Sequence, residues 1–282
     1  MGRRPANETR RPKLGQNFLA DTRAAEKIVA ALGEISQRVV IEIGPGKGAL
    51  TSLLAGRAGH LIAIELDRVL GAQLRMKYAN RSEVEIVEGD VLAMDFASLM
   101  RRERRTSGDI HPGANERAIV VGNLPYYITS PILTHLLRFH EVMTEIVIMV
   151  QKEVSERIAA RPGSRDYGVL SATAQLYAKV EKLFVLPPGA FSPPPKVDSA
   201  VLRLRVQPQL ADLKVSGEEF EDYLKLSFGQ KRKTLANNLR EKYDGETVKR
   251  ALSAAGVKSD ARAEAISLAK AAAVFRNLQG AG

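Results

Sequence analysis

The stretch Val39-Val40-Ile41-Glu42-Ile43-Gly44-Pro45-Gly46-Lys47-Gly48 decides the fold. Its first half is a short apolar run rich in β-branched residues, which predicts a strand buried on both faces. Its second half places three glycines directly after that strand, where the backbone can turn tightly and approach a ligand closely. This order predicts an open parallel sheet with a ligand site at the carboxyl end of the strand.

Similar apolar runs recur further along the chain and alternate with segments of helical spacing. The runs are Leu61–Leu66, Val84–Val87, Ile119–Val121 and Ile146–Val150, and the helical segments are Ala24–Leu32, Leu50–Ala58, Arg68–Ala79 and Pro131–Phe139. Strands that alternate with helices predict βαβ units and an α/β fold with a parallel sheet. Two later runs, Lys182–Leu186 and Val201–Val206, predict an antiparallel hairpin at the sheet edge, with a basic face at Arg203 and Arg205.

Changes in charge and in the spacing of apolar residues divide the chain into three parts. Residues 1–13 are predicted to be a flexible basic N-terminal arm, residues 14–208 a Rossmann-like domain, and residues 209–282 a small all-α domain. The helical segments expected in the last part are Phe220–Leu239, Thr247–Ala255 and Arg262–Leu278. The polar segment Arg101–Arg117 interrupts the third βα unit, and we expect it to form a mobile basic loop.

Composition narrows the function. The 282 residues contain 42 Lys and Arg against 32 Asp and Glu, a net charge of +10, which favours a polyanionic partner such as RNA or DNA. There is no Cys, which excludes disulfides, Cys-ligated zinc and thiol nucleophiles and fits a cytoplasmic protein. The four His show no metal-ligand spacing, so we expect no metal. No run approaches the ~20 apolar residues of a membrane span, so we expect neither a membrane nor a secretory segment.

The residues at the strand ends predict a nucleoside site. Gly44, Gly46 and Gly48 have the spacing G-x-G-x-G, which lacks the usual pattern of a pyrophosphate cradle. Glu65 ends the second strand, where it can accept both ribose hydroxyls, and Asp90 ends the third, where it can accept from an adenine amino group. A ligand with an adenosine but no phosphate describes S-adenosylmethionine. The alternative is a glycine-rich turn with acids that only cap helices.

The segment Asn123-Leu124-Pro125-Tyr126 follows the fourth strand and predicts the site of chemistry. An exocyclic adenine amine is a weak nucleophile, and acceptors for its N–H groups orient its lone pair. The Asn123 side-chain oxygen and the Leu124 carbonyl can supply two acceptors, Pro125 stiffens the turn, and Tyr126 offers a ring for stacking. Phe191, on the Pro-rich segment, could stack on the other face of the base, although burial in the core is the alternative.

Several motifs together resemble those of the ribosomal RNA adenine dimethyltransferases. They are Gln16-Asn17-Phe18-Leu19, the glycine-rich stretch, Glu65, Gly89-Asp90, Asn123–Tyr126, Phe191-x-Pro-Pro-Pro-Lys-Val-x-Ser199 and Phe228–Leu239. The resemblance is greatest to the bacterial small-subunit enzymes. It implies dimethylation of N6 on two adjacent adenosines in the 3′-terminal hairpin loop of 16S rRNA, with S-adenosylmethionine as donor. It also implies that Asn17 and Leu19 contact the cofactor. We expect the protein to be a monomer.

Three alternatives stay open. They are a large-subunit rRNA methyltransferase of the antibiotic-resistance type, a non-catalytic RNA-binding assembly factor with the same fold, and a DNA adenine methyltransferase. For RNA binding, the predicted residues are Lys231, Arg232, Lys233 and Arg240. The first three are adjacent on a predicted helix and would therefore fan around it, so they cannot all face one row of phosphates.

Overall fold

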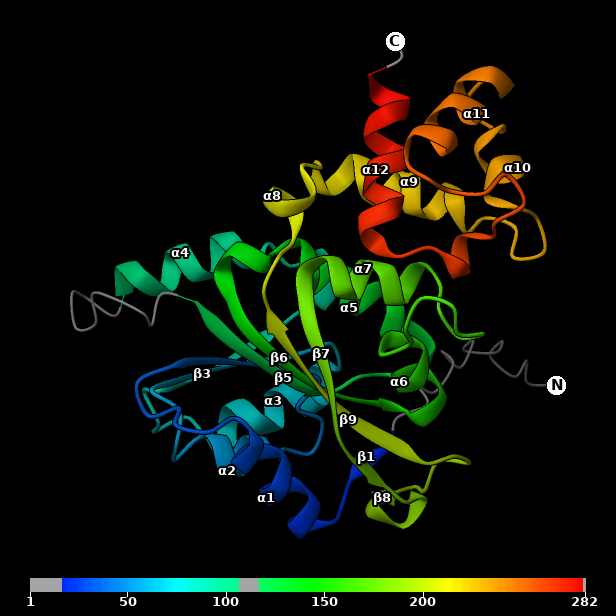
Figure 1. Cartoon of the computed structure of the whole chain (residues 1–282). Helices are drawn as coiled ribbons and strands as arrows, with labels where there is room; N and C mark the ends of the chain where they lie inside the picture. The colour runs from blue at the N-terminus through cyan, green and yellow to red at the C-terminus, as the bar shows by residue number, and fades with distance from the viewer. Residues whose placement is uncertain (1–16, 107–116, 281–282) are drawn as a thin grey trace, which may run out of the picture.

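A single seven-stranded sheet organises the computed structural model, which describes residues 17–106 and 117–280 (Figure 1). Its strand order is β4-β3-β2-β5-β6-β9-β7. The five parallel strands are β2 (Val39–Ile43), β3 (His60–Glu65), β4 (Val84–Glu88), β5 (Ala118–Asn123) and β6 (Met143–Gln151). The Rossmann-like α/β fold is thereby confirmed. The arm at 1–13 and residues 107–116 of the insertion lie outside the described residues.

The predicted antiparallel hairpin is present at one edge of the sheet. Strand β9 (Ser199–Val206) runs antiparallel to both β6 and the edge strand β7 (Ala178–Leu186). The expected basic face is wrong, because Arg203 and Arg205 each pair with the carboxylates of Glu145 and Glu181 on the neighbouring strands, at 3.2 to 3.7 Å. These arginines are neutralised within the sheet and do not form a bare cationic surface.

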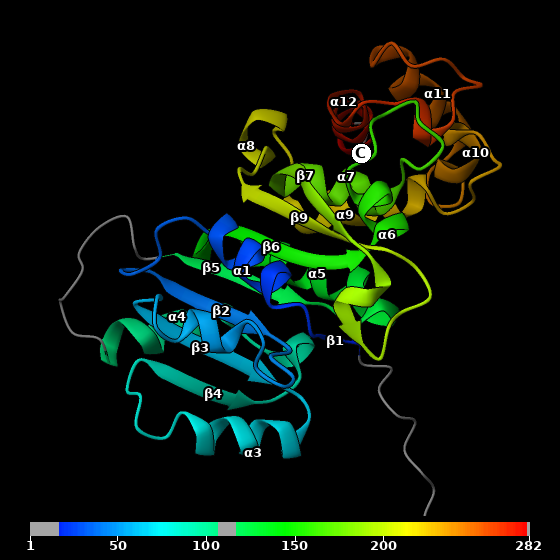
Figure 2. The same ribbon diagram turned by 90° about the horizontal axis from the view of Figure 1, so that it is seen from below.

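Helices cover both faces of the sheet (Figure 2). One face packs against α1 (Thr22–Ala31), α2 (Thr51–Leu54) and α3 (Arg68–Lys77), and the other against α4 (Phe96–Thr106), α5 (Thr129–Arg138) and α7 (Val169–Tyr177), with α6 (Lys152–Ile158) after β6. Each face has its own apolar cluster, which explains why the parallel strands read as continuous apolar runs.

Helix α4 corrects the prediction for the insertion. Residues Arg101–Thr106 are helical rather than loop, since they extend a helix anchored by Phe96, Leu99 and Met100, all buried. The sequence at Arg101 looked like a charged loop because only the preceding turns carry apolar side chains.

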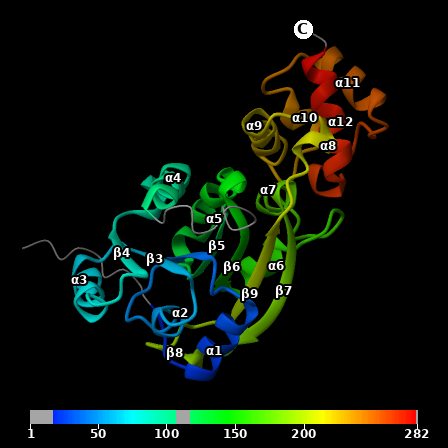
Figure 3. The same ribbon diagram turned by 90° about the vertical axis from the view of Figure 1, so that its left-hand side faces the viewer.

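The last part of the chain is entirely helical and stacks beyond α5 and α7 (Figure 3). It comprises α8 (Leu210–Leu213), α9 (Gly217–Ser227), α10 (Leu235–Leu239), α11 (Gly245–Ala254) and α12 (Leu268–Gln279). Its attachment includes the buried Glu221, which accepts from the Tyr177 hydroxyl at 2.8 Å and from Arg138 Nη2 at 2.9 Å.

The helix predicted over Phe220–Leu239 is wrong at its centre. Helix α9 ends at Ser227 with Gly229 close behind, and α10 begins after Thr234, whose hydroxyl accepts from the Asn237 amide at 3.2 Å. Residues 228–234 therefore form a connection between two helices.

Candidate active site

A pocket lies where the chain order of the strands reverses. The chain moves outward from β2 through β3 to β4 and then returns to the other side of β2 with β5. Ligands of open α/β sheets bind at the carboxyl ends of strands at such a switch point. A solvent-accessible pocket lies at this point. Among its lining residues are Asn17, Phe18, Gly44, Gly46, Glu65, Leu66, Asp90, Asn123, Leu124, Pro125, Tyr126 and Tyr127.

The glycine-rich turn forms one wall of this pocket. Gly44, Gly46 and Gly48 have φ angles of 64°, 58° and 82°, in the left-handed region that side chains disfavour. A Cβ on Gly46 would lie 2.8 and 2.9 Å from two ring carbons of Phe18. The turn is thus a cradle that requires glycine both for its conformation and for its close approach to Phe18.

Glu65 is held rigidly at the end of β3. Its side chain is buried, and its two carboxylate oxygens accept from the backbone amides of Gly46 at 2.8 Å and Asp67 at 2.9 Å. Each oxygen can accept further hydrogen bonds. A carboxylate fixed in this way at the pocket wall fits the recognition of paired hydroxyl groups.

Asp90 is exposed and follows β4 after one intervening residue, Gly89. One of its oxygens accepts from the Leu92 amide at 2.9 Å and caps the 3-10 turn η1 (Val91–Ala93). The capping role considered from the sequence is therefore present, and it fixes the carboxylate at the rim of the pocket. The neighbouring Leu66 and Val91 add apolar surface to the lining. No role was predicted for them, and their position next to the predicted acids was the only sign of one.

Asn123 is oriented by a contact with a distant part of the chain. Its side-chain Nδ2 donates to the backbone carbonyl of Asn17 at 2.8 Å. This bond fixes the amide so that Oδ1 remains an acceptor. Asn17 thus reaches the pocket, whereas Leu19 is buried in the core and does not line it.

The turn after Asn123 is stiffened from both sides. The Pro125 carbonyl accepts from the Ile128 amide at 3.1 Å and from the Thr129 hydroxyl at 3.2 Å. The Tyr126 hydroxyl lies 2.6 Å from Ser199 Oγ on β9, and burial raises the pKa of Tyr126. Tyr126 is therefore a fixed, protonated side chain at neutral pH. Ser199 was part of a motif in the sequence but had no predicted role.

Phe191 is not brought into the pocket. It lies on β8 (Phe191–Ser192), which pairs with β1 (Phe18–Leu19), and its ring is 4% exposed within the apolar cluster beneath α1. The structure therefore shows the alternative considered from the sequence, burial in the core. A stacking role for Phe191 would require its ring to leave that cluster.

Glu42, on β2 beneath the glycine-rich turn, is fully buried. Burial raises its pKa to about 8, and the nearby Glu65 acts in the same direction. Glu42 is thus predominantly protonated at neutral pH.

The four predicted RNA-binding cations are all exposed in the helical part. Lys231, Arg232 and Lys233 lie in the connection between α9 and α10, so their predicted fanning around a helix is wrong. Lys231 Nζ donates to the Arg165 carbonyl at 2.8 Å, and Lys233 lies 3.6 Å from Glu241. Arg240 follows α10 and donates to Asn237 at 3.2 Å.

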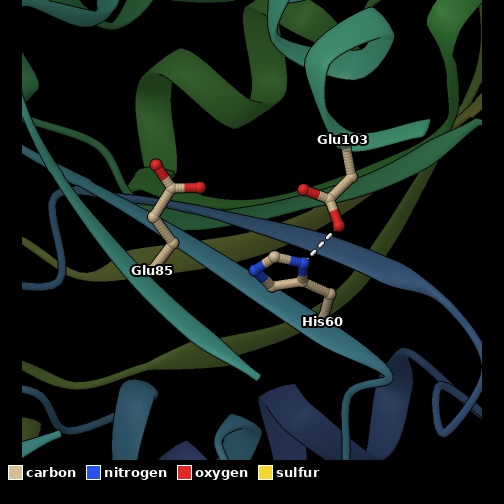
Figure 4. A group of neighbouring side chains, drawn as sticks. All are labelled: His60, Glu85 and Glu103. Carbon is tan, nitrogen blue, oxygen red and sulfur yellow. Dashed lines mark hydrogen bonds and ion pairs between the residues drawn. The ribbon is translucent and has the colours of Figure 1, made fainter. Parts of the chain in front are cut away.

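One group of side chains in the described ranges has the spacing to hold a metal ion. It consists of His60, Glu85 and Glu103, and Figure 4 shows His60 between the two acids. His60 is the first residue of β3, so the group lies at the amino ends of the strands, opposite the pocket at their carboxyl ends. His60 pairs with Glu103, which raises the pKa of His60, and Glu85 accepts from Arg102 at 2.6 and 2.7 Å. These pairs tie α4 to the sheet, and the absence of a metal stays a prediction.

The fold and the pocket define a class: an α/β protein with a Rossmann-like domain and a ligand site at the switch point of its sheet. Comparison with known proteins makes this more specific. A model of the family described as Ribosomal RNA adenine dimethylase matches residues 7–279. This chain belongs to that family, so it is an rRNA adenine dimethyltransferase, as the sequence motifs predicted.

Curated relatives support this membership over nearly the whole chain. A Ribosomal RNA small subunit methyltransferase A from Koribacter versatilis is 54% identical and covers 96% of this chain and 95% of its own length. The protein of the same name from Acidobacterium capsulatum is 52% identical, with 95% and 91% covered.

Solved structures share the fold. The 23S rRNA methyltransferase ErmE has a TM-score of 0.64 and 28% identity, covering 93% of this chain and all of that one. A dimethyladenosine transferase from Plasmodium falciparum has a TM-score of 0.75 at 23% identity, covering 93% and 98%.

Proposed function

We propose that this protein uses S-adenosylmethionine to dimethylate N6 of two adjacent adenosines in the 3′-terminal hairpin loop of 16S rRNA, within the small ribosomal subunit. The observation that carries the proposal is the orientation of Asn123. Because its Nδ2 is bound to the Asn17 carbonyl, its Oδ1 remains an acceptor beside the glycine-rich turn. An acceptor placed there suits an exocyclic amine, which can donate to it. An ionised carboxylate or phosphate has no hydrogen to donate.

The pocket residues fit the cofactor. The left-handed glycines leave open backbone where side chains would intrude, and Glu65 is fixed by two amides with acceptor capacity to spare for the ribose hydroxyls. Asp90 stands at the rim for the adenine amino group, with Leu66 and Val91 as apolar walls. When bound, S-adenosylmethionine supplies an electrophilic methyl group.

The residues of the chain then act by orientation. Asn123 Oδ1 and the Leu124 carbonyl accept from the amine, which turns the nitrogen lone pair toward the methyl donor. The Tyr126 ring, fixed through Ser199, offers a face to the base. A strong general base is unnecessary because the nitrogen becomes cationic on methylation and then loses its proton readily. The raised pKa of the Tyr126 hydroxyl agrees with this, since the group stays protonated.

The choice of the small subunit rests on the names of the relatives at 52 and 54% identity, since the large-subunit enzyme ErmE shares 28%. Exposed cations of the α9–α10 connection support RNA as the partner, and a ribosomal substrate places the protein in the cytoplasm.

The test is methyl transfer with a labelled donor to three substrates: small subunits that lack the modification, large subunits and duplex DNA. We expect label in small subunits alone, as N6,N6-dimethyladenosine. Label in large subunits or DNA would assign the corresponding alternative, and binding to small subunits with no label in any substrate would indicate an assembly factor. Asn80→Ala, at an exposed site away from the pocket, is the matched control for Asn123→Ala.

A further inference from the structure

Tyr127 differs from every other tyrosine of the chain. Its side chain is 61% exposed, whereas the other six of the seven tyrosines are buried or half-buried. It lies on the rim of the pocket that contains Asn123 and Pro125. Within residues 17–106 and 117–280, no group bonds to its hydroxyl and no aromatic ring packs on it. The fold thus presents a large ring to solvent beside the site of chemistry.

The backbone that carries this ring is firmly held. Tyr127 lies in the 3-10 turn η3 (Tyr126–Ile128), which the Pro125 carbonyl closes through the Ile128 amide, and Tyr126 is anchored to Ser199. An exposed side chain on a rigid turn loses little backbone entropy when it makes a contact. Tyr127 therefore has the properties of a preformed contact surface.

We propose that Tyr127 is a positioning residue whose ring stacks on the base next to the target adenosine. The proposal rests on the proposed function, in which two adjacent adenosines are modified. A base that enters the pocket leaves its neighbour without one stacking partner. An exposed aromatic ring on the rim can replace that partner, because stacking requires only the flat face of each ring. The enzyme would thus grip two neighbouring nucleotides, with one in the pocket and one on its rim.

The most direct test places 2-aminopurine, whose fluorescence is quenched by stacking, next to the target adenosine in rRNA assembled into small subunits. We expect quenching on addition of the wild-type protein and of Tyr127→Phe, and its loss with Tyr127→Ala. Tyr127→Ala should weaken binding by about 5- to 150-fold, the range typical of one stacked base, with a larger effect on KM than on kcat. Val185→Ala removes a similarly exposed apolar side chain outside the pocket lining and should behave as wild type.

A double-mutant cycle separates stacking from a general loss of stability. In one arm of the cycle, the neighbouring base is removed to leave an abasic nucleotide. This should weaken binding of the wild type to small subunits as much as Tyr127→Ala does. It should not weaken binding of the Tyr127→Ala variant any further. Three results would each overturn the proposal if the wild type still transfers methyl groups. They are equal binding by the wild type and Tyr127→Ala, absence of quenching with the wild type, and losses of affinity that add when Tyr127→Ala meets the abasic nucleotide. If the wild type itself transfers no methyl group to small subunits, the proposed function has failed instead.

Discussion

Gly46→Ala tests whether the glycine-rich turn is preformed by contact with Phe18. At a φ of 58°, an alanine costs about 1–2 kcal/mol of backbone strain. Its Cβ would also lie 2.8 Å from the Phe18 ring, and relief of such overpacking typically costs a further ~1–3 kcal/mol. The free energy of unfolding should therefore fall by about 2–5 kcal/mol. Cofactor affinity should fall with it, because Phe18 lines the pocket and the Gly46 amide holds Glu65.

The measurements are urea unfolding and calorimetric titration with S-adenosylmethionine. Gly163→Ala is the matched control, since its φ is 88° but no atom lies within 4 Å of the added Cβ, so only the ~1–2 kcal/mol of strain applies. In a Phe18→Ala background the cost of Gly46→Ala should shrink to the same value. Two results would refute the reasoning. One is that Gly46→Ala and Gly163→Ala lower the free energy of unfolding equally. The other is that Gly46→Ala costs as much in the Phe18→Ala background as in the wild type.

Three further changes test other parts of the structure. Because the folded state raises the pKa of Glu42 from 4.5 to about 8, it binds the proton more tightly than the unfolded chain. The free energy of unfolding should therefore fall as the pH rises from 4.5 to about 8. Urea unfolding of Glu42→Gln at the same pH values should not show this fall. Glu221→Gln weakens the bonds from Tyr177 and Arg138 and should lower the free energy of unfolding by about 1–3 kcal/mol; an unchanged urea midpoint would contradict this. Replacing Lys231, Arg232 and Lys233 by alanine should flatten the salt dependence of ribosome binding by up to about one unit of slope per lost phosphate contact, whereas parallel lines would show a merely solvated surface.

The sheet could be predicted from the sequence because each buried parallel strand is a continuous apolar run. Strand β2 has the predicted bounds. Strands β4, β5 and β6 extend the predicted runs by one to three residues at an end, and β3 is shifted by one residue. The strand-end positions of Gly44, Glu65, Asp90 and Asn123 followed directly, and all four line one pocket. Their binding roles remain predictions.

What the sequence did not predict depends on contacts between distant residues. The side chain of Asn123 is oriented by donating to the carbonyl of Asn17, 106 positions away, and the partner of Tyr126 is Ser199. The sequence suggested a basic face at Arg203 because its partners, Glu145 and Glu181, lie far from it in the sequence, on adjacent strands. The break at 228–234 was missed because apolar spacing continues on both sides of it.

The role of the pocket in methyl transfer is the central claim, and mass spectrometry of nucleosides from small subunits tests it most directly. Wild-type protein and Asn80→Ala should produce N6,N6-dimethyladenosine at two adjacent positions. Asn123→Ala should bind small subunits with unchanged affinity and produce almost none, because it lacks the acceptor that orients the amine. Wild-type levels of dimethyladenosine from Asn123→Ala would contradict the account.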